Sequence, residues 1–430
     1  MNARFVTRVR WVAAVCVFLC VVIIGKLYVL QIINGDDYAR RADAQSVGLK
    51  SPLLNRGTIY FTAKDGTLIT AATLGQVGTS TENQRYYPGG SLAAQALGFV
   101  AYNNDNDQKG RYGLERYYEQ TLSRGNNDSY ANFFVELFGG FAGDTENAGG
   151  QGDIVTTIEP SVQTELERTL ADYTSTWHPV LAGGIIMDPK TGEIFAMATQ
   201  PTFDPNYFNL EKTTNAFKNP HVESVFEMGS IIKPLTMAAG LDSGTVTEKS
   251  TYNDTGCITL ETKPICNFDH VARGVIPMQE ILSQSLNVGS AYIATKMGSD
   301  TFRDYFLNRY KLSTETGIDL PGEIHGLTQN LQNDRQVEIA TAAFGQGIAI
   351  TPVETIRALA SIGNGGMLVT PHVVRAVKYD TGVTRTLSWG TEGPILKPET
   401  VTAISRMLTQ VVDTKLADGK LKMEHYSLAA

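Results

Sequence analysis

The chain has 430 residues, enough for two or three domains at roughly 150 residues each. Hydrophobic residues make up 42% of it and charged residues 19%, which excludes both wholesale disorder and a fold that crosses the membrane many times. The formal net charge is −8 and no lysine- and arginine-rich block is present, which argues against a nucleic-acid binder. The four cysteines form no CxxC pair and no cluster with histidine at metal-ligand spacing. The sequence therefore predicts neither a structural metal nor a cofactor.

Residues 11–33 form one long apolar segment, interrupted only by Lys26 and Gln31. A helix needs roughly 20 apolar residues to cross a bilayer. Three arginines precede the segment and two aspartates follow it, so the positive-inside rule predicts a cytoplasmic tail at 1–10 and an extracytoplasmic remainder. A cleaved signal peptide is the alternative, but the segment is long and no small-x-small cleavage site closes it. We expect a single-pass protein of the cytoplasmic (inner) membrane.

The extracytoplasmic part divides at a glycine-rich stretch, 139–153, which has the composition of a linker. It separates a first domain at 38–150 from a second at 152–430. Within the second domain, the pattern at 182–199 predicts a β-hairpin and the pattern at 257–266 another. Helices are predicted to start at or near Ser230 and to cover 277–286, 288–298, 300–310 and 351–366. This mixture of hairpins and helices indicates an α+β fold.

Ser230 and Lys233 are the first candidate catalytic residues. Three positions apart on a helix, their side chains share a face, so the amine can approach the hydroxyl. A lysine whose pKa is lowered by burial can activate a serine nucleophile. A second pair, Ser285 and Asn287, falls between two predicted helices. Ser285 could relay a proton, and Asn287 could bind a substrate amide.

A structural explanation for these four residues is a solvent-facing helix turn and a polar helix cap. A general hydrolase is disfavoured because the chain has no G-x-S-x-G elbow.

Several segments, in order, resemble class B penicillin-binding proteins, the monofunctional transpeptidases of cell-wall synthesis. In the first domain these are LNRGTIY, with Arg56 and Gly57, RYYPGGSLAAQALGFV and GRYGLERYYEQTL. In the second they are DIVTTIEPSVQ, FEMGSIIKPLT with its Ser-x-x-Lys-Pro element, the Ser-x-Asn element at 285–287, and FGQGIAITPVE. The order of the matches is more specific than any one motif.

The resemblance implies a transmembrane helix, a small α+β pedestal (dimerisation-like) domain and a transpeptidase domain with an antiparallel sheet flanked by helices. It implies that Ser230 is acylated by D-Ala-D-Ala stem peptides of peptidoglycan and by β-lactams, with Lys233 as the base and Ser285 and Asn287 completing the polar network. The implied protein partners are a membrane-embedded glycan polymerase and other division or elongation proteins.

One departure from the family concerns the strand that carries its Lys-Thr/Ser-Gly element, which is not found, while the final residues MEHYSLAA resemble those that lead into it. We therefore expect the sequence to be a fragment that ends just before that strand and is itself inactive.

Cys257 and Cys266 flank the second predicted hairpin, where either a disulfide or two free thiols would fit.

Two other functions remain open. A β-lactamase or β-lactam sensor would share Ser230, Lys233 and the second motif. A catalytically impaired scaffold of the division or elongation machinery would keep the anchor and pedestal. The form of the nucleophile motif favours a septal role over elongation.

Overall fold

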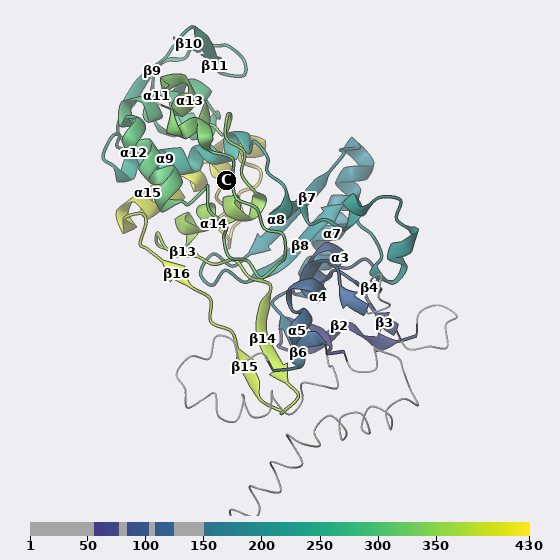
Figure 1. The fold of residues 1–430 in the computed structure, drawn as a ribbon. Coiled ribbons are helices and arrows are strands. Elements are labelled where there is room, and N and C mark those ends of the chain that lie inside the picture. The colour runs from purple at the N-terminus through teal and green to yellow at the C-terminus, as the bar shows by residue number, and fades with distance from the viewer. Residues whose placement is uncertain (1–55, 77–83, 103–107, 124–149, 334) are drawn as a thin grey trace, which may run out of the picture. The chain divides into compact units, whose positions relative to one another are not determined.

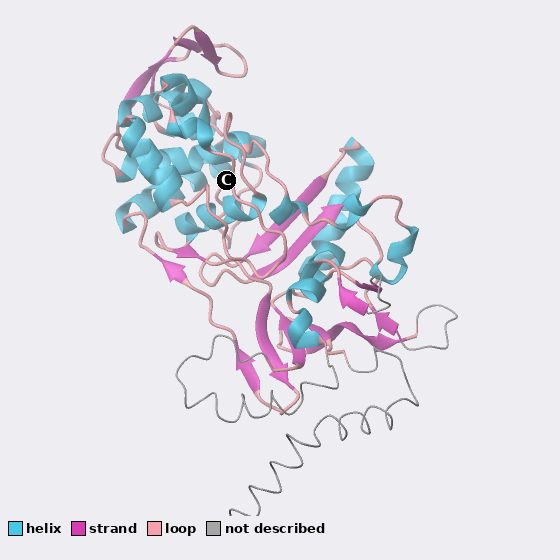
Figure 2. Ribbon diagram, in the orientation of Figure 1, coloured by secondary structure: helices cyan, strands magenta, loops and turns pink. Residues whose placement is uncertain are grey.

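The computed structural model describes residues 56–76, 84–102, 108–123, 150–333 and 335–430 (Figure 1). The predicted tail at 1–10, the predicted anchor at 11–33 and residues 139–149 of the predicted linker lie outside these residues. Within them, none of the helices has the length and apolar character needed to span a bilayer. Helices and sheets are mixed along the chain, as the α+β prediction requires (Figure 2).

A six-stranded sheet joins distant parts of the chain. Its strand order is β15-β14-β6-β1-β2-β3, with β1 and β6 parallel and every other pair antiparallel. Three strands precede the predicted linker, namely β1 (Ile59–Thr62), β2 (Leu68–Gly75) and β3 (Gln84–Tyr86). The other three follow it, namely β6 (Gly152–Thr156), β14 (Val374–Tyr379) and β15 (Thr384–Thr386). Residues on both sides of the predicted linker thus share one hydrophobic core.

Short elements pack beside this sheet: α3 (Ala94–Leu97), β4 (Val100–Tyr102), β5 (Gln108–Gly110), α4 (Gly113–Tyr117) and α5 (Glu119–Leu122). They hold a buried cluster of charges. The carboxylate of Glu115, which is fully buried, pairs with Arg56 at 2.7 Å and with Arg85 at 2.6 Å. Burial alone raises the pKa of Glu115, but the two guanidinium groups outweigh burial and lower it.

The charge cluster gives a structural role to three of the segments that resemble the family. Arg56, Arg85 and Glu115 come from LNRGTIY, RYYPGGSLAAQALGFV and GRYGLERYYEQTL, respectively. The residue after Arg56 must be small, because a Cβ on Gly57 would collide with the carbonyl oxygen of Gly152 at the start of β6. The three segments are therefore brought together by one ion network.

The predicted hairpin at 182–199 is confirmed as β7 (Ala182–Met187) and β8 (Ile194–Gln200), paired antiparallel. Helix α7 (Pro160–Trp177) lies along it (Figure 1). The buried side chain of Gln163 joins the two elements, because it donates to the Met197 carbonyl at 3.0 Å and accepts from the Met197 N–H at 2.9 Å.

The helical part forms a second core around α9 (Lys233–Asp242). Its other helices are α10 (Gln279–Ser283), α11 (Asn287–Met297), α12 (Ser299–Arg303) with the following η5 (Asp304–Arg309), α13 (Gln336–Ala342), α14 (Pro352–Gly363) and α15 (Pro398–Thr414). The four helices predicted between 277 and 366 are confirmed, with somewhat shorter bounds. Helix α14 starts with a capping box between Thr351 and Glu354.

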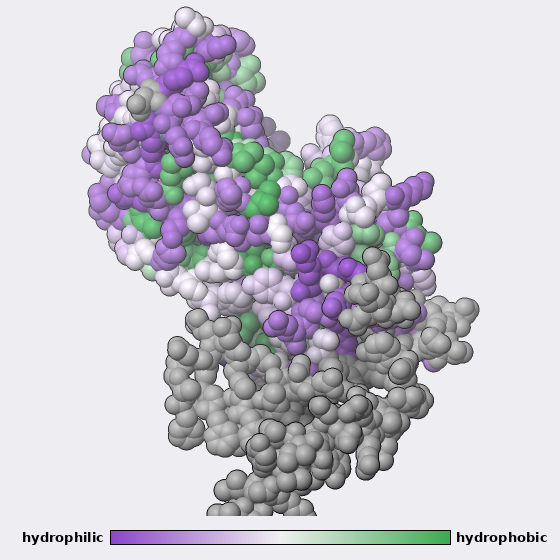
Figure 3. All heavy atoms as spheres, viewed as in Figure 1, coloured by the Kyte–Doolittle hydropathy of each residue, from purple (hydrophilic) through white to green (hydrophobic). Residues whose placement is uncertain are grey.

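Smaller elements complete the described chain. They are η2 (Pro205–Leu210), η3 (Thr214–Phe217), α8 (Pro220–Glu223), η4 (Gly229–Ile232), β9 (Thr251–Asp254), β10 (Cys257–Leu260), β11 (Lys263–Cys266), β12 (Gly274–Pro277), η6 (Gln329–Gln332), β13 (Leu368–Val369), β16 (Thr391–Glu392) and η7 (Leu416–Gly419). On the face shown in Figure 3, hydrophobic residues gather near the middle of the surface, below a largely hydrophilic region.

Candidate active site

Ser230 lies at the start of the helix that runs through the helical core. The 3₁₀ turn η4 (Gly229–Ile232) leads directly into α9, and Pro234 occupies the first turn of α9, where its missing N–H removes no intrahelical bond. The prediction that a helix starts at or near Ser230 is confirmed. First-turn N–H groups have no acceptor within their own helix, so the Ser230 N–H can serve an external acceptor.

Lys233 contacts both candidate serines. Its Nζ lies 3.1 Å from Ser230 Oγ, 2.9 Å from Ser285 Oγ and 2.6 Å from the Ser285 carbonyl oxygen. Ser230 and Ser285 are exposed, whereas Lys233 is only 3% exposed. The buried amine therefore contacts two accessible hydroxyl groups. The predicted approach of Lys233 to Ser230 is confirmed.

Burial changes the charge of this amine. Desolvation lowers the pKa of Lys233 to about 8, because a buried ammonium loses the water that stabilises its charge. A much larger share of the side chain is then neutral near neutral pH than for an exposed lysine. A neutral amine next to a hydroxyl can accept its proton, so Ser230 can become a nucleophile.

Ser285 lies between α10 and α11, as predicted, whereas Asn287, predicted to lie there too, begins α11. Ser285 has a left-handed backbone with φ of 54°, which turns its carbonyl and hydroxyl toward Lys233. Such a conformation is costly for a residue with a Cβ and is often found at functional sites. Asn287 is the first residue of α11, and its side-chain N–H donates to the carbonyl of Cys266 at 2.9 Å.

The sequence did not reveal how the nucleophile loop is supported. Gly345 accepts from the Gly229 N–H at 3.2 Å, and Gly347 donates to the Glu227 carboxylate at 2.9 Å. Gly345 has a φ of 77°, and a Cβ there would collide with the backbone of Gly229. These glycines belong to FGQGIAITPVE, which resembled a family segment without indicating a role. The signal that could have found them was the pair of glycines, since only glycine fits such a close approach.

A cavity of about 560 Å³ lies beside the side chains of Ser230, Lys233 and Ser285. Ser230, Lys233 and Ser285 line one part of it, and apolar residues of α14 and α15 line much of the rest, among them Leu359, Ile362, Leu408 and Val411. Its size falls within the range of small-ligand sites. The site can therefore hold a ligand against the serine hydroxyls.

The letters Lys-Thr-Gly do occur once in the chain, at Lys190–Gly192, but not on a strand. They form the turn between β7 and β8, where Gly192 donates to Asp188 and accepts from His372. The cavity lining given above does not include them. This tripeptide therefore belongs to the hairpin turn.

Cys257 and Cys266 form a disulfide, which resolves the alternative left open by the sequence. The two residues face each other in the β10–β11 hairpin, with Cα atoms 4.1 Å apart. Together with His270 they are the one His/Cys group among the described residues whose ligand atoms lie close enough for a metal ion. Both sulfur atoms are already bonded to each other, so the group does not form a metal site in this state.

An exposed serine, a buried lysine three residues later and a second serine within hydrogen-bonding distance of that lysine form an arrangement that can support serine acyl transfer. The chain belongs to the penicillin-binding protein transpeptidase family, whose transpeptidase domain matches residues 182–430. It is 28% identical over 355 residues to stage V sporulation protein D of Bacillus subtilis, covering 82% of this chain and 54% of that protein. It is 29% identical over 294 residues to the peptidoglycan D,D-transpeptidase FtsI of Escherichia coli K12, covering 66% of this chain and 47% of that one.

The fold is similar to that of penicillin-binding protein 3 of Mycobacterium tuberculosis, with a TM-score of 0.70 at 23% identity over 84% of this chain and 75% of that one. That protein has also been solved with aztreonam and with ampicillin. The chain spans about half the length of the curated relatives given above, 54% and 47% respectively.

Proposed function

We propose that this protein is a peptidoglycan D,D-transpeptidase that cross-links stem peptides through an acyl-enzyme on Ser230. The observation that carries the proposal is the placement of a buried lysine amine, with its pKa lowered to about 8, 3.1 Å from an exposed serine hydroxyl. The family of the chain and the name of its FtsI relative support the same reaction.

In the acylation step, the neutral amine of Lys233 accepts the proton of Ser230 Oγ. The oxygen attacks the carbonyl carbon of the penultimate D-alanine, forming a C–O bond. The charge that develops on the carbonyl oxygen is stabilised by the Ser230 N–H at the helix start, and one such donor contributes about 10²–10³ in rate. The bond to the terminal D-alanine nitrogen then breaks.

The leaving nitrogen needs a proton, and Ser285 is placed to deliver it. Its hydroxyl lies 2.9 Å from Lys233 Nζ, so the proton taken from Ser230 can pass from Lys233 through Ser285 to the departing D-alanine. An amine of a neighbouring strand then attacks the ester carbonyl, loses its proton along the same path and restores the Ser230 hydroxyl. A β-lactam opens its ring amide in the first step, and the tethered nitrogen blocks this second attack.

Asn287 contributes binding rather than proton transfer in this proposal. One N–H of its amide donates to Cys266, which fixes the orientation of the amide and leaves the oxygen and the other N–H to contact the backbone of a stem peptide.

We further propose that residues 11–33 anchor the protein in the cytoplasmic membrane, with 1–10 in the cytoplasm, a pedestal from 38 to 150 and the transpeptidase domain from 152 outside. The anchor would place the site next to a membrane-embedded glycan polymerase at the division septum. The apolar length and the flanking charges support the anchor. In intact spheroplasts, an added protease should digest the part after residue 38 and leave a tag at the N-terminus intact. Digestion of the N-terminal tag would exclude this orientation.

The test of the enzymatic proposal uses protein expressed from its complete reading frame. A fluorescent penicillin should label it covalently, and Ser230→Ala should abolish the label. Incubation with a D-Ala-D-Ala stem peptide and an amine acceptor should release D-alanine and form the cross-linked product. Persistent labelling of Ser230→Ala would exclude Ser230 as the nucleophile. Rapid hydrolysis of the penicillin would favour a β-lactamase, and a folded protein that is never labelled would favour a scaffold.

A further inference from the structure

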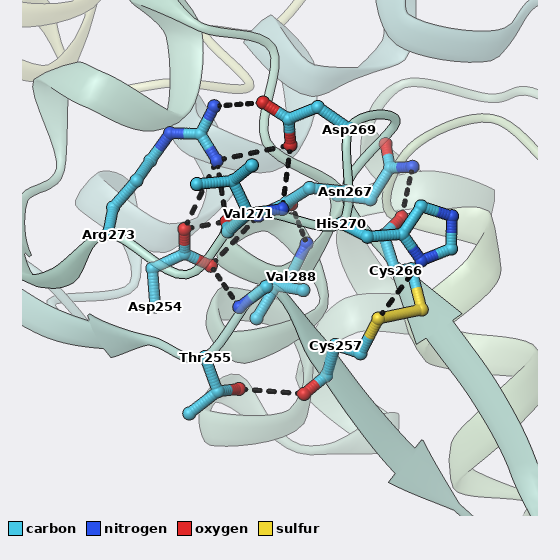
Figure 4. Close-up of a disulfide and its surroundings, with 12 residues drawn as sticks. Asp254, Thr255, Cys257, Cys266, Asn267, Asp269, His270, Val271, Arg273 and Val288 are labelled. Atoms are coloured by element: carbon cyan, nitrogen blue, oxygen red, sulfur yellow. Dashed lines mark hydrogen bonds and ion pairs between the residues drawn. A yellow bond between two sulfur atoms is a disulfide. The ribbon is translucent and has the colours of Figure 1, made fainter.

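The β10–β11 hairpin lies against the start of α11, where the Ser-x-Asn element at 285–287 ends. Figure 4 shows its disulfide and, beside it, Asn267 with Val288. Its two four-residue strands are joined through Glu261 and Thr262, both at positive φ, and the Cys257–Cys266 disulfide closes the opposite, open end. A two-stranded hairpin this short has little stability of its own. The disulfide therefore fixes the end of the hairpin from which the chain continues toward the site.

The two residues at that end bind the start of α11 directly. The carbonyl of Cys266 accepts the Asn287 side-chain N–H at 2.9 Å, and the side-chain oxygen of Asn267 accepts the Val288 N–H at 3.1 Å. The residue before α11, Leu286, provides no side-chain cap. Asn267 thus supplies from outside the helix the acceptor that an N-cap residue ordinarily provides.

Asn267 can do this in only one orientation, because its other atoms are already bonded. It is 1% exposed, and its side-chain nitrogen donates to both oxygens of Asp254, at 2.9 and 3.1 Å. Asp254 is itself buried, with Arg273 at 3.6 Å. The amide of Asn267 therefore presents its oxygen to α11 and its nitrogen to Asp254.

A second contact ties the hairpin to the same helix. Ile265, one residue before Cys266, is 5% exposed and packs with Ala291 of α11 and with Phe344. On the other side of Asn287, Lys233 bonds the carbonyl and hydroxyl of Ser285. The stretch from Ser285 to Val288 is consequently held at one end by the catalytic lysine and at the other by residues 266 and 267.

We propose that the disulfide-closed hairpin is a positioning device for Asn287, with the Cys266 carbonyl and the Asn267 side chain as its positioning groups. The inference deepens the proposed function and rests on it: the hairpin would orient the amide that contacts the stem peptide or β-lactam. Displacements of about 1 Å in such groups can cost up to about 10²-fold in rate. Since the β-ladder and Ile265 remain after the disulfide is lost, we expect a fall on the order of tenfold.

The test measures the second-order rate of Ser230 acylation by a fluorescent penicillin, using protein from the complete reading frame with and without dithiothreitol. The dithiol supplies two electrons and two protons to the S–S bond, giving two thiols, and is itself oxidised to a cyclic disulfide. Reduction should lower the rate on the order of tenfold, and reoxidation should restore it. The variant Cys257→Ala/Cys266→Ala should show the lowered rate with and without the reductant. Cys16 and Cys20 are the other cysteines of residues 1–430, and they are retained in that variant, so it also controls for their reduction.

A positioning role is separated from a general structural one by repeating the reduction in Asn287→Ala. If the hairpin acts through Asn287, reduction should cause no further loss in that background, since the two changes are then coupled. An equal loss in both backgrounds would overturn the inference. So would an unchanged rate in the reduced wild type.

Failure of the proposed function would look different. If the oxidised protein is not acylated at all, the proposed function fails, and the side-chain amide resonances of Asn287, assigned with Asn287→Asp, decide the structural claim. A shift of those resonances on reduction supports the positioning contact, and their constancy overturns it.

Discussion

The hydroxyl of Tyr118 donates a 2.9 Å hydrogen bond to the carboxylate of Asp319, 201 residues further along the chain. The same carboxylate accepts from the N–H groups of Val373 and Val374 at 2.7 and 2.9 Å. Asp319 is fully buried, and burial raises its pKa from 3.8 to about 6. Three distant parts of the chain thus meet at one titratable group. They are the segment around Tyr118, the loop that carries Asp319 and the start of β14.

This group makes folding stability depend on pH. The folded protein binds a proton at Asp319 more tightly than the unfolded chain does, so its contribution to stability is greatest below about pH 4 and is lost as pH rises through about 6. The loss amounts to about 2–3 kcal/mol. In urea unfolding between pH 4 and 7, Asp319→Asn should lack this decline. The exposed Asp172→Asn should keep the wild-type slope, and parallel slopes for Asp319→Asn and wild type would contradict the assignment.

The pKa of Lys233 predicts the pH dependence of acylation. Since the neutral amine is the base, the acylation rate should rise with pH and level off above about 8. Replacing the amine in Lys233→Ala should cost about 10²–10⁴ in rate. Stopped-flow labelling with a fluorescent penicillin measures both effects. Lys190→Ala, in the exposed β7–β8 turn, should keep the wild-type rate, whereas a large loss there would mean that the tripeptide at 190–192 takes part in catalysis.

Gly345 should be intolerant of a side chain. A Cβ would collide with the backbone of Gly229 and displace Ser230 from Lys233, so Gly345→Ala should lower acylation by at least about tenfold. Gly365 offers a matched control, because its φ is also positive at 61° and nothing lies within 4 Å of its Cβ position. Equal acylation rates for Gly345→Ala and Gly365→Ala would show that the collision is relieved without moving the nucleophile.

Removing a charge from the buried cluster of Arg56, Arg85 and Glu115 should lower the unfolding free energy far more than removing one from a surface ion pair. Glu115→Gln leaves Arg56 and Arg85 buried without their shared carboxylate, a change that typically costs about 3–5 kcal/mol. Urea unfolding monitored by circular dichroism would measure the loss. The exposed pair between Glu165 and Arg168 is the control, and Glu165→Gln should leave the unfolding free energy unchanged. A Glu115→Gln protein as stable as wild type would show that the two arginines find other partners.

The sequence predicted those parts of the site that lie close together along the chain. Ser230 and Lys233 are one helical turn apart, and the hairpins and helices around them follow local patterns of apolar and turn residues. The contact of Lys233 with Ser285 spans 52 residues. No local pattern encodes such a contact, and only the resemblance to a family suggested it.

Three other features were also beyond sequence reasoning. The parallel pairing of β1 with β6 and the addition of β14 depend on long-range packing. The hydrogen bond between Asn287 and Cys266 depends on how the separate β10–β11 hairpin packs against α11. Whether Cys257 and Cys266 are joined could not be decided from their spacing, because spacing does not report the distance between two strands.

The six-stranded sheet has a consequence for how the chain is made. Strands β1 to β3 are synthesised early, but β6, which pairs with β1, and β14, which pairs with β6, come from residues 152–156 and 374–379. Until β6 has been synthesised, one edge of β1 has no partner strand. The other edge of β6 then stays unpaired until β14 has been synthesised, more than 200 residues later. Unpaired edges invite association with other chains, and closing such long loops slows folding. A nascent chain therefore remains exposed to such association until β14 has been synthesised.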